Sequence, residues 1–295
     1  PSVISMVTPS SGVQAQEAGS SPDFYMLERT MASRSASFRF AAPIVLVLSA
    51  TAAVADPIDL TPWTALTLDF PGGQSAGRWV LEPGATAVKQ VVNADPSFFL
   101  NNVNQTSIKI DGTWQVVSGG DDDYMGFVFG YQNSSNFYAF DWKKSGQSYV
   151  GQYAAEGMTI KRFTGATGDG LVDLSLAEFW ENEDNLGDMT VLATNHATDK
   201  GWVDGRLYDF HLDYNVVAGQ FTIVVKDGAT TLWDKTVVDN TFNSGQFGFY
   251  NNSQQNVRYA GFEFTPVVPE PETYMLMLAG LFVVGGIAAK RRRAG

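Results

Sequence analysis

Apolar and polar residues alternate along most of the middle of this chain. In residues 107–117, the apolar side chains Ile108, Ile110, Trp114 and Val116 are separated by polar or small residues. Because successive side chains of a strand point to opposite faces, this period of two predicts a strand with one buried face. Similar alternation, or enrichment in β-branched and aromatic residues, occurs at 65–70, 125–131, 137–142, 206–214, 221–225, 231–238, 246–250 and 258–264.

Clusters of Gly, Asn, Asp and Ser separate these segments and predict turns. The polar residues 132–136 join two strand-like segments and predict a β-hairpin. Helical spacing of apolar residues occurs in one stretch of the sequence, 171–186. Many short strands with little helix predict an all-β fold, and the length of 56–268 fits one antiparallel jelly-roll β-sandwich.

The composition supports a packed core and excludes several kinds of chemistry. Hydrophobic residues make up 44% of the chain, so global disorder is not expected. The net charge of −12 repels a phosphate backbone, so we expect no nucleic-acid partner and an affinity for divalent cations. The chain has no cysteine, which excludes disulfides, a thiol nucleophile and thiolate metal ligands. Its two histidines, His196 and His211, lack a metal-binding spacing.

The first part of the chain has the pattern of a secretory signal peptide. Residues 31–55 contain basic residues, then an apolar run, then the small-residue cleavage motif formed by Ala53, Val54 and Ala55. We therefore expect residues 1–30 to be a non-native upstream segment. The mature domain is then expected to occupy 56–268.

The last part of the chain, residues 269–295, has three features in a fixed order. They are the tripeptide Pro269-Glu270-Pro271, an apolar run at 274–289 that predicts a C-terminal transmembrane helix, and a basic cluster containing Arg291, Arg292 and Arg293. This order resembles the PEP-CTERM sorting signal of Gram-negative, exopolysaccharide-producing bacteria. The resemblance implies transient retention in the inner membrane, removal of the tail by a membrane protease (an exosortase), and export to the cell envelope or beyond it. A plain membrane anchor is the alternative.

Two blocks of the body resemble the thrombospondin C-terminal domain. The first contains Asp121-Asp122-Asp123-Tyr124, the run from Gly126 to Gln132, Phe137-Tyr138 and Trp142-Lys143; the second contains Gly201-Trp202, the run from Phe221 to Val225, Asp234-Lys235-Thr236 and the run from Gly245 to Gly248. The resemblance implies a legume-lectin-like (concanavalin A-like) sandwich that binds calcium on its loops and acts outside the cell in adhesion or matrix assembly. The chain lacks the Asp-rich repeats and the cysteines of thrombospondins. The resemblance therefore does not predict that it binds the receptors of thrombospondins.

Two acidic loops are candidate calcium sites. Asp121, Asp122 and Asp123 follow two glycines and precede a strand, and three adjacent carboxylates repel one another unless water or a cation screens them. Alternation along the strand leads us to expect that two of the three bind the ion. Asp123 is the first choice because it adjoins the strand, and Asp121 is the second because it projects to the same side. Asp169 and Asp173 form a second acidic loop, which we rank below the first, and a solvated turn is the alternative for both.

Carbohydrate chemistry is the remaining class to consider. Trp180 and Trp202 fall in less regular segments than the other tryptophans, so they are the candidates for stacking on sugar rings. Glu178, Glu181 and Glu183 raise the alternative of a glycoside hydrolase acting on exopolysaccharide, although an exposed acidic face explains them more simply. We expect a non-catalytic adhesion or matrix module. The hydrolase and a purely structural envelope protein are the alternatives.

Overall fold

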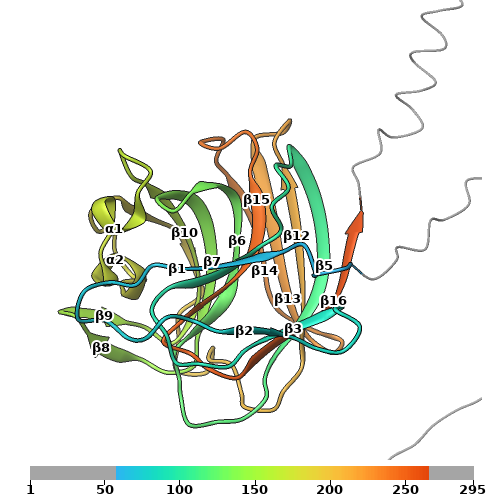
Figure 1. The fold of residues 1–295 in the computed structure, drawn as a ribbon, viewed down its shortest axis with the longest axis horizontal. Helices are drawn as coiled ribbons and strands as arrows, with labels where there is room; N and C mark the ends of the chain where they lie inside the picture. The colour runs from blue at the N-terminus through green and yellow to red at the C-terminus, as the bar shows by residue number, and fades with distance from the viewer. Residues whose placement is uncertain (1–57, 266–295) are drawn as a thin grey trace, which may run out of the picture. The chain divides into compact units, whose positions relative to one another are not determined.

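The computed structural model describes residues 58–265, which form two seven-stranded β-sheets packed face to face (Figure 1). Neighbouring strands of both sheets run antiparallel. The all-β antiparallel sandwich predicted from alternation is therefore confirmed. The predicted hairpin is also present, because the strands on either side of residues 134–135 pair directly.

The strand order brings together segments that are far apart in the sequence. The first sheet has the order β1 (Thr64–Thr67), β4 (Ser97–Leu100), β15 (Gln246–Asn252), β6 (Tyr124–Asn133), β7 (Asn136–Lys143), β10 (Gly157–Thr164) and β11 (Met189–Thr194). The second has the order β14 (Thr230–Val238), β13 (Gln220–Asp227), β12 (Tyr208–Asn215), β5 (Ser107–Val116), β16 (Val257–Thr265), β3 (Ala87–Gln90) and β2 (Trp79–Leu81). A separate hairpin pairs β8 (Gln147–Tyr149) with β9 (Gln152–Ala154).

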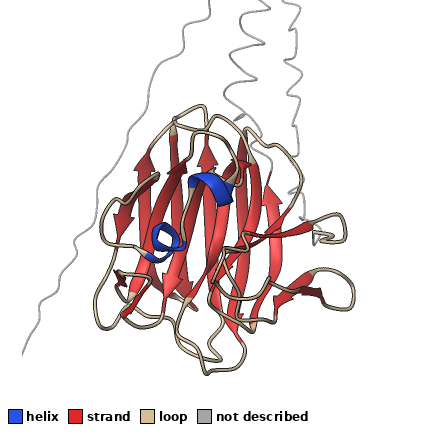
Figure 2. Ribbon diagram, turned by 60° about the vertical axis from the view of Figure 1, so that its left-hand side comes forward, coloured by secondary structure: helices blue, strands red, loops and turns tan. Residues whose placement is uncertain are grey.

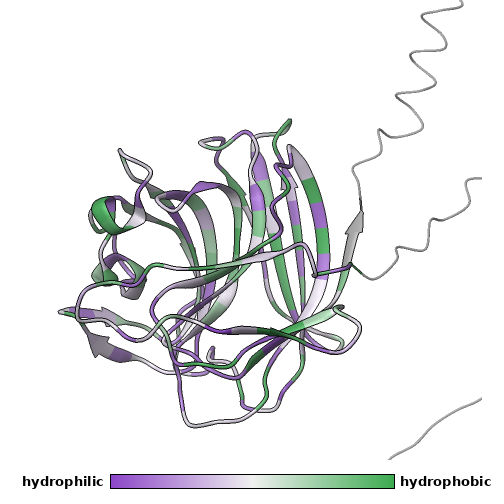
Figure 3. Ribbon diagram, viewed as in Figure 1, coloured by the Kyte–Doolittle hydropathy of each residue, from purple (hydrophilic) through white to green (hydrophobic). Residues whose placement is uncertain are grey.

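The main hydrophobic core lies between the two sheets. Buried and less buried residues alternate at every position of β5, as expected for a strand with one face toward the core. Trp114 on this strand is completely buried. Its ring stacks on that of Phe210, with 4.6 Å between the ring centroids, and on that of Phe140 of the opposite sheet, with 5.5 Å between them. Figure 3 shows the alternation as purple and green bands along strands of the second sheet.

The first sheet is covered on its outer face as well. Two short helices, α1 (Gly170–Asp173) and α2 (Leu176–Trp180), lie against that face together with the β8–β9 hairpin (Figures 1 and 2). They complete a second apolar cluster, in which the Phe179 ring of α2 stacks on Phe163 of β10 at 4.9 Å. Strands β6 and β7 are consequently buried on both faces.

The helical stretch predicted at 171–186 is two separate helices. Leu174 has the extended angles φ −112° and ψ 166°, so it ends α1. Ser175 then begins α2 with a capping box, in which its side chain and that of Glu178 satisfy each other's backbone amides. The interruption lets Phe179 and Trp180 turn toward the sheet.

The predicted fold class also included a C-terminal transmembrane helix at 274–289, and this part is corrected. Within residues 58–265 no helix is long and apolar enough to cross a membrane. The helices α1 and α2 have four and five residues, whereas a span requires roughly 20. The run 274–289 lies outside the described residues, as do the predicted signal peptide and sorting tail, and the fold class is the β-sandwich alone.

Candidate metal site

The three adjacent aspartates lie in the loop between β5 and β6. Gly120, immediately before them, has a φ of +124°, which is a conformation that favours glycine. Asp121 and Asp122 are half-buried and Asp123 is buried, and one carboxylate oxygen from each lies within 4.8 Å of the others. Strand alternation does not separate the three side chains, because all of them precede Tyr124, the first residue of β6.

The acidic loop borders an open hollow of about 490 Å³. Its walls come from the loop itself and from the segment after β7, and they are formed by Gly120, Asp121, Asp122, Lys144, Ser145 and Gln147. The hydroxyl of Ser145 donates a hydrogen bond to the Asp122 carboxylate. The backbone amide of Lys144 donates to the Asp122 carbonyl at 3.0 Å. These contacts fix the loop against the end of the first sheet.

The carboxyl group of Asp121 has no cationic partner among the described residues. Its carboxylate accepts hydrogen bonds from the Asn93 side-chain amide at 2.5 Å and from the Asp122 backbone amide at 3.2 Å. Burial, followed by the negative charge of Asp123, raises the pKa of Asp121 to about 7. Within residues 58–265 no lysine or arginine forms an ion pair with it.

Asp123, in contrast, has a buried cationic partner. The Lys143 ammonium lies 2.6 Å from its carboxylate, and the Lys143 side chain is completely buried. The backbone of Asp123 is anchored twice: its amide donates to the Gln254 side chain at 3.0 Å, and its carbonyl accepts from the Trp202 indole at 3.0 Å. Asp123 is therefore the most firmly held of the three.

This donor set fits a divalent cation with a preference for oxygen. Calcium takes carboxylate and carbonyl oxygens in flexible geometry. Asp121 and Asp122 face an open hollow and have no short ion pair, whereas Asp123 is already neutralised by Lys143. The residues that would hold calcium are thus Asp121 and Asp122, in place of the predicted pair Asp123 and Asp121. An ion there would oppose the two effects that raise the pKa of Asp121, which are burial and the negative charge of Asp123.

Comparison with known families decides the identity of this fold. Residues 74–265 match the family described as the thrombospondin C-terminal region. The chain belongs to this family. The match confirms the resemblance found in the sequence, and it covers the acidic loop and all strands from β2 to β16 of this thrombospondin C-terminal domain.

The curated relatives that match this chain include thrombospondins and cartilage oligomeric matrix proteins of vertebrates. Thrombospondin-3b of Danio rerio is 28% identical over 225 residues, which cover 74% of this chain and 24% of that protein. The cartilage oligomeric matrix protein of Homo sapiens is 28% identical over 231 residues, which cover 75% of this chain and 30% of that protein. The chain therefore spans less than a third of the length of either relative.

Several solved structures align with the domain at low similarity. The exoplasmic/lumenal domain of VIP36, in a form bound to Ca²⁺ and Man3GlcNAc, aligns with a TM-score of 0.47 and 10% identity over 72% of this chain and 88% of that one. The winged bean acidic lectin, in complex with methyl-α-D-galactose, gives a TM-score of 0.42 and 8% identity over 68% of this chain and 97% of that one. At these values the likeness says nothing about a ligand of the domain.

The second acidic loop of the domain has a structural role. Asp169 is the N-cap of α1 and accepts a hydrogen bond from the Leu171 amide at 3.0 Å. Asp173 accepts from the backbone amides of Thr167 and Gly168, both at 2.9 Å, and these and neighbouring hydroxyl bonds lower its pKa against the opposing effect of burial. The two carboxylates close the loop before α1, and among the described residues the acidic group with metal-like spacing is the one at Asp121–Asp123.

The tryptophans proposed for sugar stacking are core residues, so that prediction is corrected. Trp180 and Trp202 are 2% and 1% exposed, and neither ring has a face open to solvent. The Trp180 indole donates to the Gln147 carbonyl at 3.2 Å, and its ring lies under the Lys143 ammonium at 4.4 Å. Trp202 holds the backbone of Asp123. Both were misassigned because their segments lack the alternation of a strand. Trp180 ends α2, which packs on the outer face of the first sheet, and Trp202 lies in a loop, from which its indole reaches the Asp123 carbonyl.

The carboxylates behind the hydrolase alternative are also engaged within the fold. Glu178 is buried and accepts from the Ser175 and Asp188 amides at 2.8 and 2.7 Å. Glu181 is buried and accepts from the Glu183 and Asp184 amides at 2.8 and 3.1 Å. Glu178 and Glu181 therefore stabilise turns, whereas Glu183 is exposed.

Sequence reasoning missed three residues that shape the metal site: Asn93, Lys143 and Gln254. Lys143 offered a signal, since alternation along β7 places it on the same face as the apolar residues Phe137 and Ala139. Asn93 and Gln254 offered none, because both come from loops distant in sequence.

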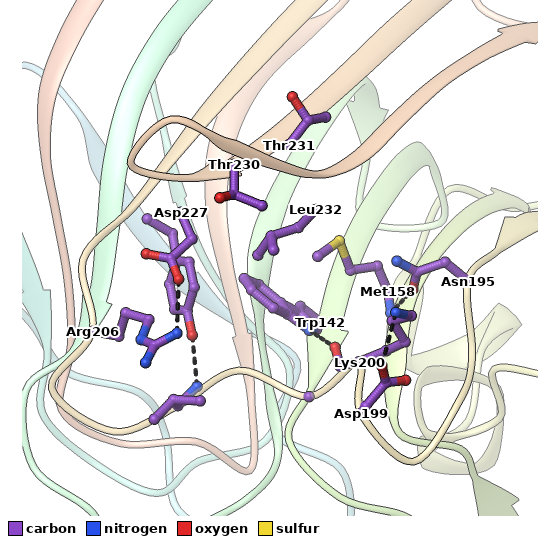
Figure 4. Close-up of a pocket in the computed structure, with 13 residues that line it drawn as sticks. Trp142, Met158, Asn195, Asp199, Lys200, Arg206, Asp227, Thr230, Thr231 and Leu232 are labelled. Carbon is purple, nitrogen blue, oxygen red and sulfur yellow. Dashed lines mark hydrogen bonds and ion pairs between the residues drawn. The ribbon is translucent and has the colours of Figure 1, made fainter. Parts of the chain in front are cut away.

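A second hollow lies at another part of the sandwich edge, with a volume of about 320 Å³ (Figure 4). Trp142, Met158 and Leu232 form its apolar floor. On one side the Arg206 guanidinium pairs with Asp227 at 2.7 Å, and on the other Lys200 pairs with Asp199 at 3.1 Å. The charges on its walls are therefore balanced.

Proposed function

We propose that this thrombospondin C-terminal domain is an exported, calcium-binding module of adhesion or extracellular-matrix type, without catalytic activity. The observation that carries the proposal is the half-buried carboxylate of Asp121, which lies beside Asp122 and Asp123 and lacks a cationic partner among the described residues. Calcium would supply that missing positive charge, and its binding would make the stability of the domain depend on the calcium concentration of its surroundings.

Thermal unfolding of the full chain in calcium chloride or in chelator tests the proposal. Calcium at about 100 times its dissociation constant adds about 2.7 kcal/mol to the free energy of unfolding. For a domain of this size, that energy raises the melting temperature by about 5–11 °C. The double variant D121N/D122N is expected to lose the shift. Its matched control is D209N/D234N, which removes two exposed carboxylates from the second sheet and keeps the shift. Equal melting temperatures of the wild type with calcium and with chelator would refute calcium binding.

Export and processing complete the proposal. The motifs at Ala53 and Ala55 and at Pro269-Glu270-Pro271 support removal of a signal peptide and of a sorting tail. The enzyme for the second cleavage is then an exosortase, and the destination is the envelope or the surroundings of a Gram-negative cell. The module acts there between cells and matrix.

A glycan such as exopolysaccharide is a second candidate ligand, favoured by the hollow of Figure 4. Hydroxyl groups can both donate to Asp227 and accept from Arg206, while the apolar floor covers the C–H face of a sugar. Titration with exopolysaccharide oligomers, followed by the amide signals of the hollow in NMR, tests this candidate. R206M is expected to weaken binding at least about tenfold, by analogy with a lost charged hydrogen bond; K109M, which removes an exposed cation from the second sheet, is the control.

A further inference from the structure

Lys143 is a buried cation at the end of β7. Its side chain is completely buried, and β-sheet pairing places it opposite Tyr124, the residue that follows the acidic triplet. Burying an ammonium group is costly unless oxygen atoms surround it and replace its water. The contacts of Lys143 therefore indicate which oxygens hold it.

The oxygens around the Lys143 ammonium belong largely to the acidic loop. They are a carboxylate oxygen of Asp123 at 2.6 Å, the carbonyl of Asp122 at 3.4 Å, the side-chain carbonyl of Gln147 at 3.4 Å and a carboxylate oxygen of Asp122 at 4.0 Å. The rings of Trp180 and Tyr124 lie 4.4 and 5.3 Å from the same nitrogen and shield it from solvent. Carboxylate and carbonyl oxygens are also the ligands that a hard metal ion takes.

We propose that Lys143 is a built-in cation of the acidic site: it occupies Asp123, leaves Asp121 and Asp122 for one divalent ion, and lowers the affinity of the site for calcium. This inference rests on the proposed function. Lys143 is a positioning residue, because it acts on the metal through the carboxylates that it holds or approaches. The positive charge of Lys143 also lowers calcium affinity directly, by repelling the metal ion.

The electrostatic consequence is large enough to measure. A metal on Asp122 lies within a few ångströms of the ammonium, since that ammonium is 4.0 Å from an Asp122 carboxylate oxygen. At an effective dielectric constant of about 20, a unit charge and a divalent ion separated by several ångströms would repel strongly enough to weaken binding by more than about tenfold. Since every 1.4 kcal/mol is a factor of ten in affinity, removal of the ammonium charge is expected to tighten calcium binding at least about tenfold.

The test compares the calcium dissociation constants of the full-length wild type and K143Q by isothermal titration with calcium chloride. Glutamine removes the charge and retains a donor for Asp123. We expect K143Q to melt at a lower temperature in chelator, since Asp123 loses its ion pair, but to bind calcium at least about tenfold more tightly. The control K109Q removes an ammonium of the second sheet, which pairs with Asp213 at 2.9 Å, and is expected to change calcium affinity less than about threefold.

A second pair of variants covers the case in which K143Q does not fold without calcium. D123N leaves the ammonium beside Asp122 without its carboxylate, whereas D123N/K143Q replaces the buried ion pair by a neutral pair of similar shape. The double variant is expected to bind calcium at least about tenfold more tightly than D123N. Equal dissociation constants within both comparisons, in proteins that bind calcium, would overturn the role of Lys143 and leave the proposed function intact. If the wild type binds no calcium, the proposed function itself fails and this inference fails with it.

Discussion

The Lys161 ammonium lies 2.8 Å from the Asp141 carboxylate, and both side chains are 1% exposed. The pair sits on the outer face of the first sheet, where the ammonium also donates to the Phe179 carbonyl at 2.9 Å. Burial lowers the pKa of Lys161 and raises that of Asp141, and each partner opposes the shift of the other. This ion pair therefore ties α2 to strands β7 and β10.

Replacing one partner of this ion pair is predicted to destabilise the domain more than replacing both partners. K161M leaves the Asp141 carboxylate buried without a partner and is expected to lower the free energy of unfolding by about 3–5 kcal/mol. The double variant D141L/K161M removes both charges and is expected to recover most of that loss. Urea denaturation measures the three free energies. A double variant no more stable than K161M would show that the pair itself, and not the orphaned charge, is responsible.

His196 is predicted to make the domain sensitive to mild acid. Burial, reinforced by the positive charge of Lys161 and opposed by Glu181, lowers the pKa of His196 to about 4. Its ring nitrogen Nε2 lies 2.8 Å from the Thr159 hydroxyl. Since the unfolded histidine titrates near 6.5, the unfolded chain binds the proton first, so the stability linked to neutral His196 is present above about pH 6.5 and is lost as the pH falls toward 4.

The measurement for His196 is the change in melting temperature between pH 7 and pH 5. The wild type is expected to lose more than H196Q, because glutamine retains a hydrogen-bonding group and does not titrate. Other groups titrate in both proteins, so the difference between the two reports on His196. An equal loss in the two proteins would exclude this contribution.

Trp202 is predicted to act through the acidic loop. W202F removes the indole donor to the Asp123 carbonyl, and leaving that buried acceptor unsatisfied is expected to cost about 1–3 kcal/mol of unfolding free energy. W233F is the control, since Trp233 lies on β14 and its ring packs against Phe140 in the core between the sheets. W202F should also weaken calcium binding, measured by titration, whereas W233F should not. Identical calcium affinities would separate Trp202 from the metal site.

Both ends of the chain are predicted to be removed during export. Intact-mass measurement of the native exported protein is expected to give a chain that begins near Asp56 and lacks Arg291, Arg292 and Arg293. The A53K/A55K variant should block the first cleavage, and replacement of Pro269-Glu270-Pro271 by three alanines should block the second. A mature species that retains the basic cluster would contradict the processing of the tail.

Strands with one face toward solvent could be predicted from the sequence. The period-two patterns at 107–117, 221–225 and 231–238 correspond to β5, β13 and β14 of the second sheet, whose outer face is open. The hairpin of β6 and β7 was predicted from its turn and its aromatic residues. The acidic triplet was also visible, because adjacent carboxylates are a local feature of the chain.

The first sheet and the partners of the triplet were decided by tertiary structure. Strands β4 and β10 gave no alternating signal, since both of their faces are largely buried once α2 and the β8–β9 hairpin cover the outer side. The same covering buries Trp180 and encloses Lys143. The local sequence pattern indicates which side of a strand faces solvent. The packing of α2 and the β8–β9 hairpin on the first sheet, and the ion pair of Lys143 with Asp123, depend instead on contacts between residues that the fold brings together.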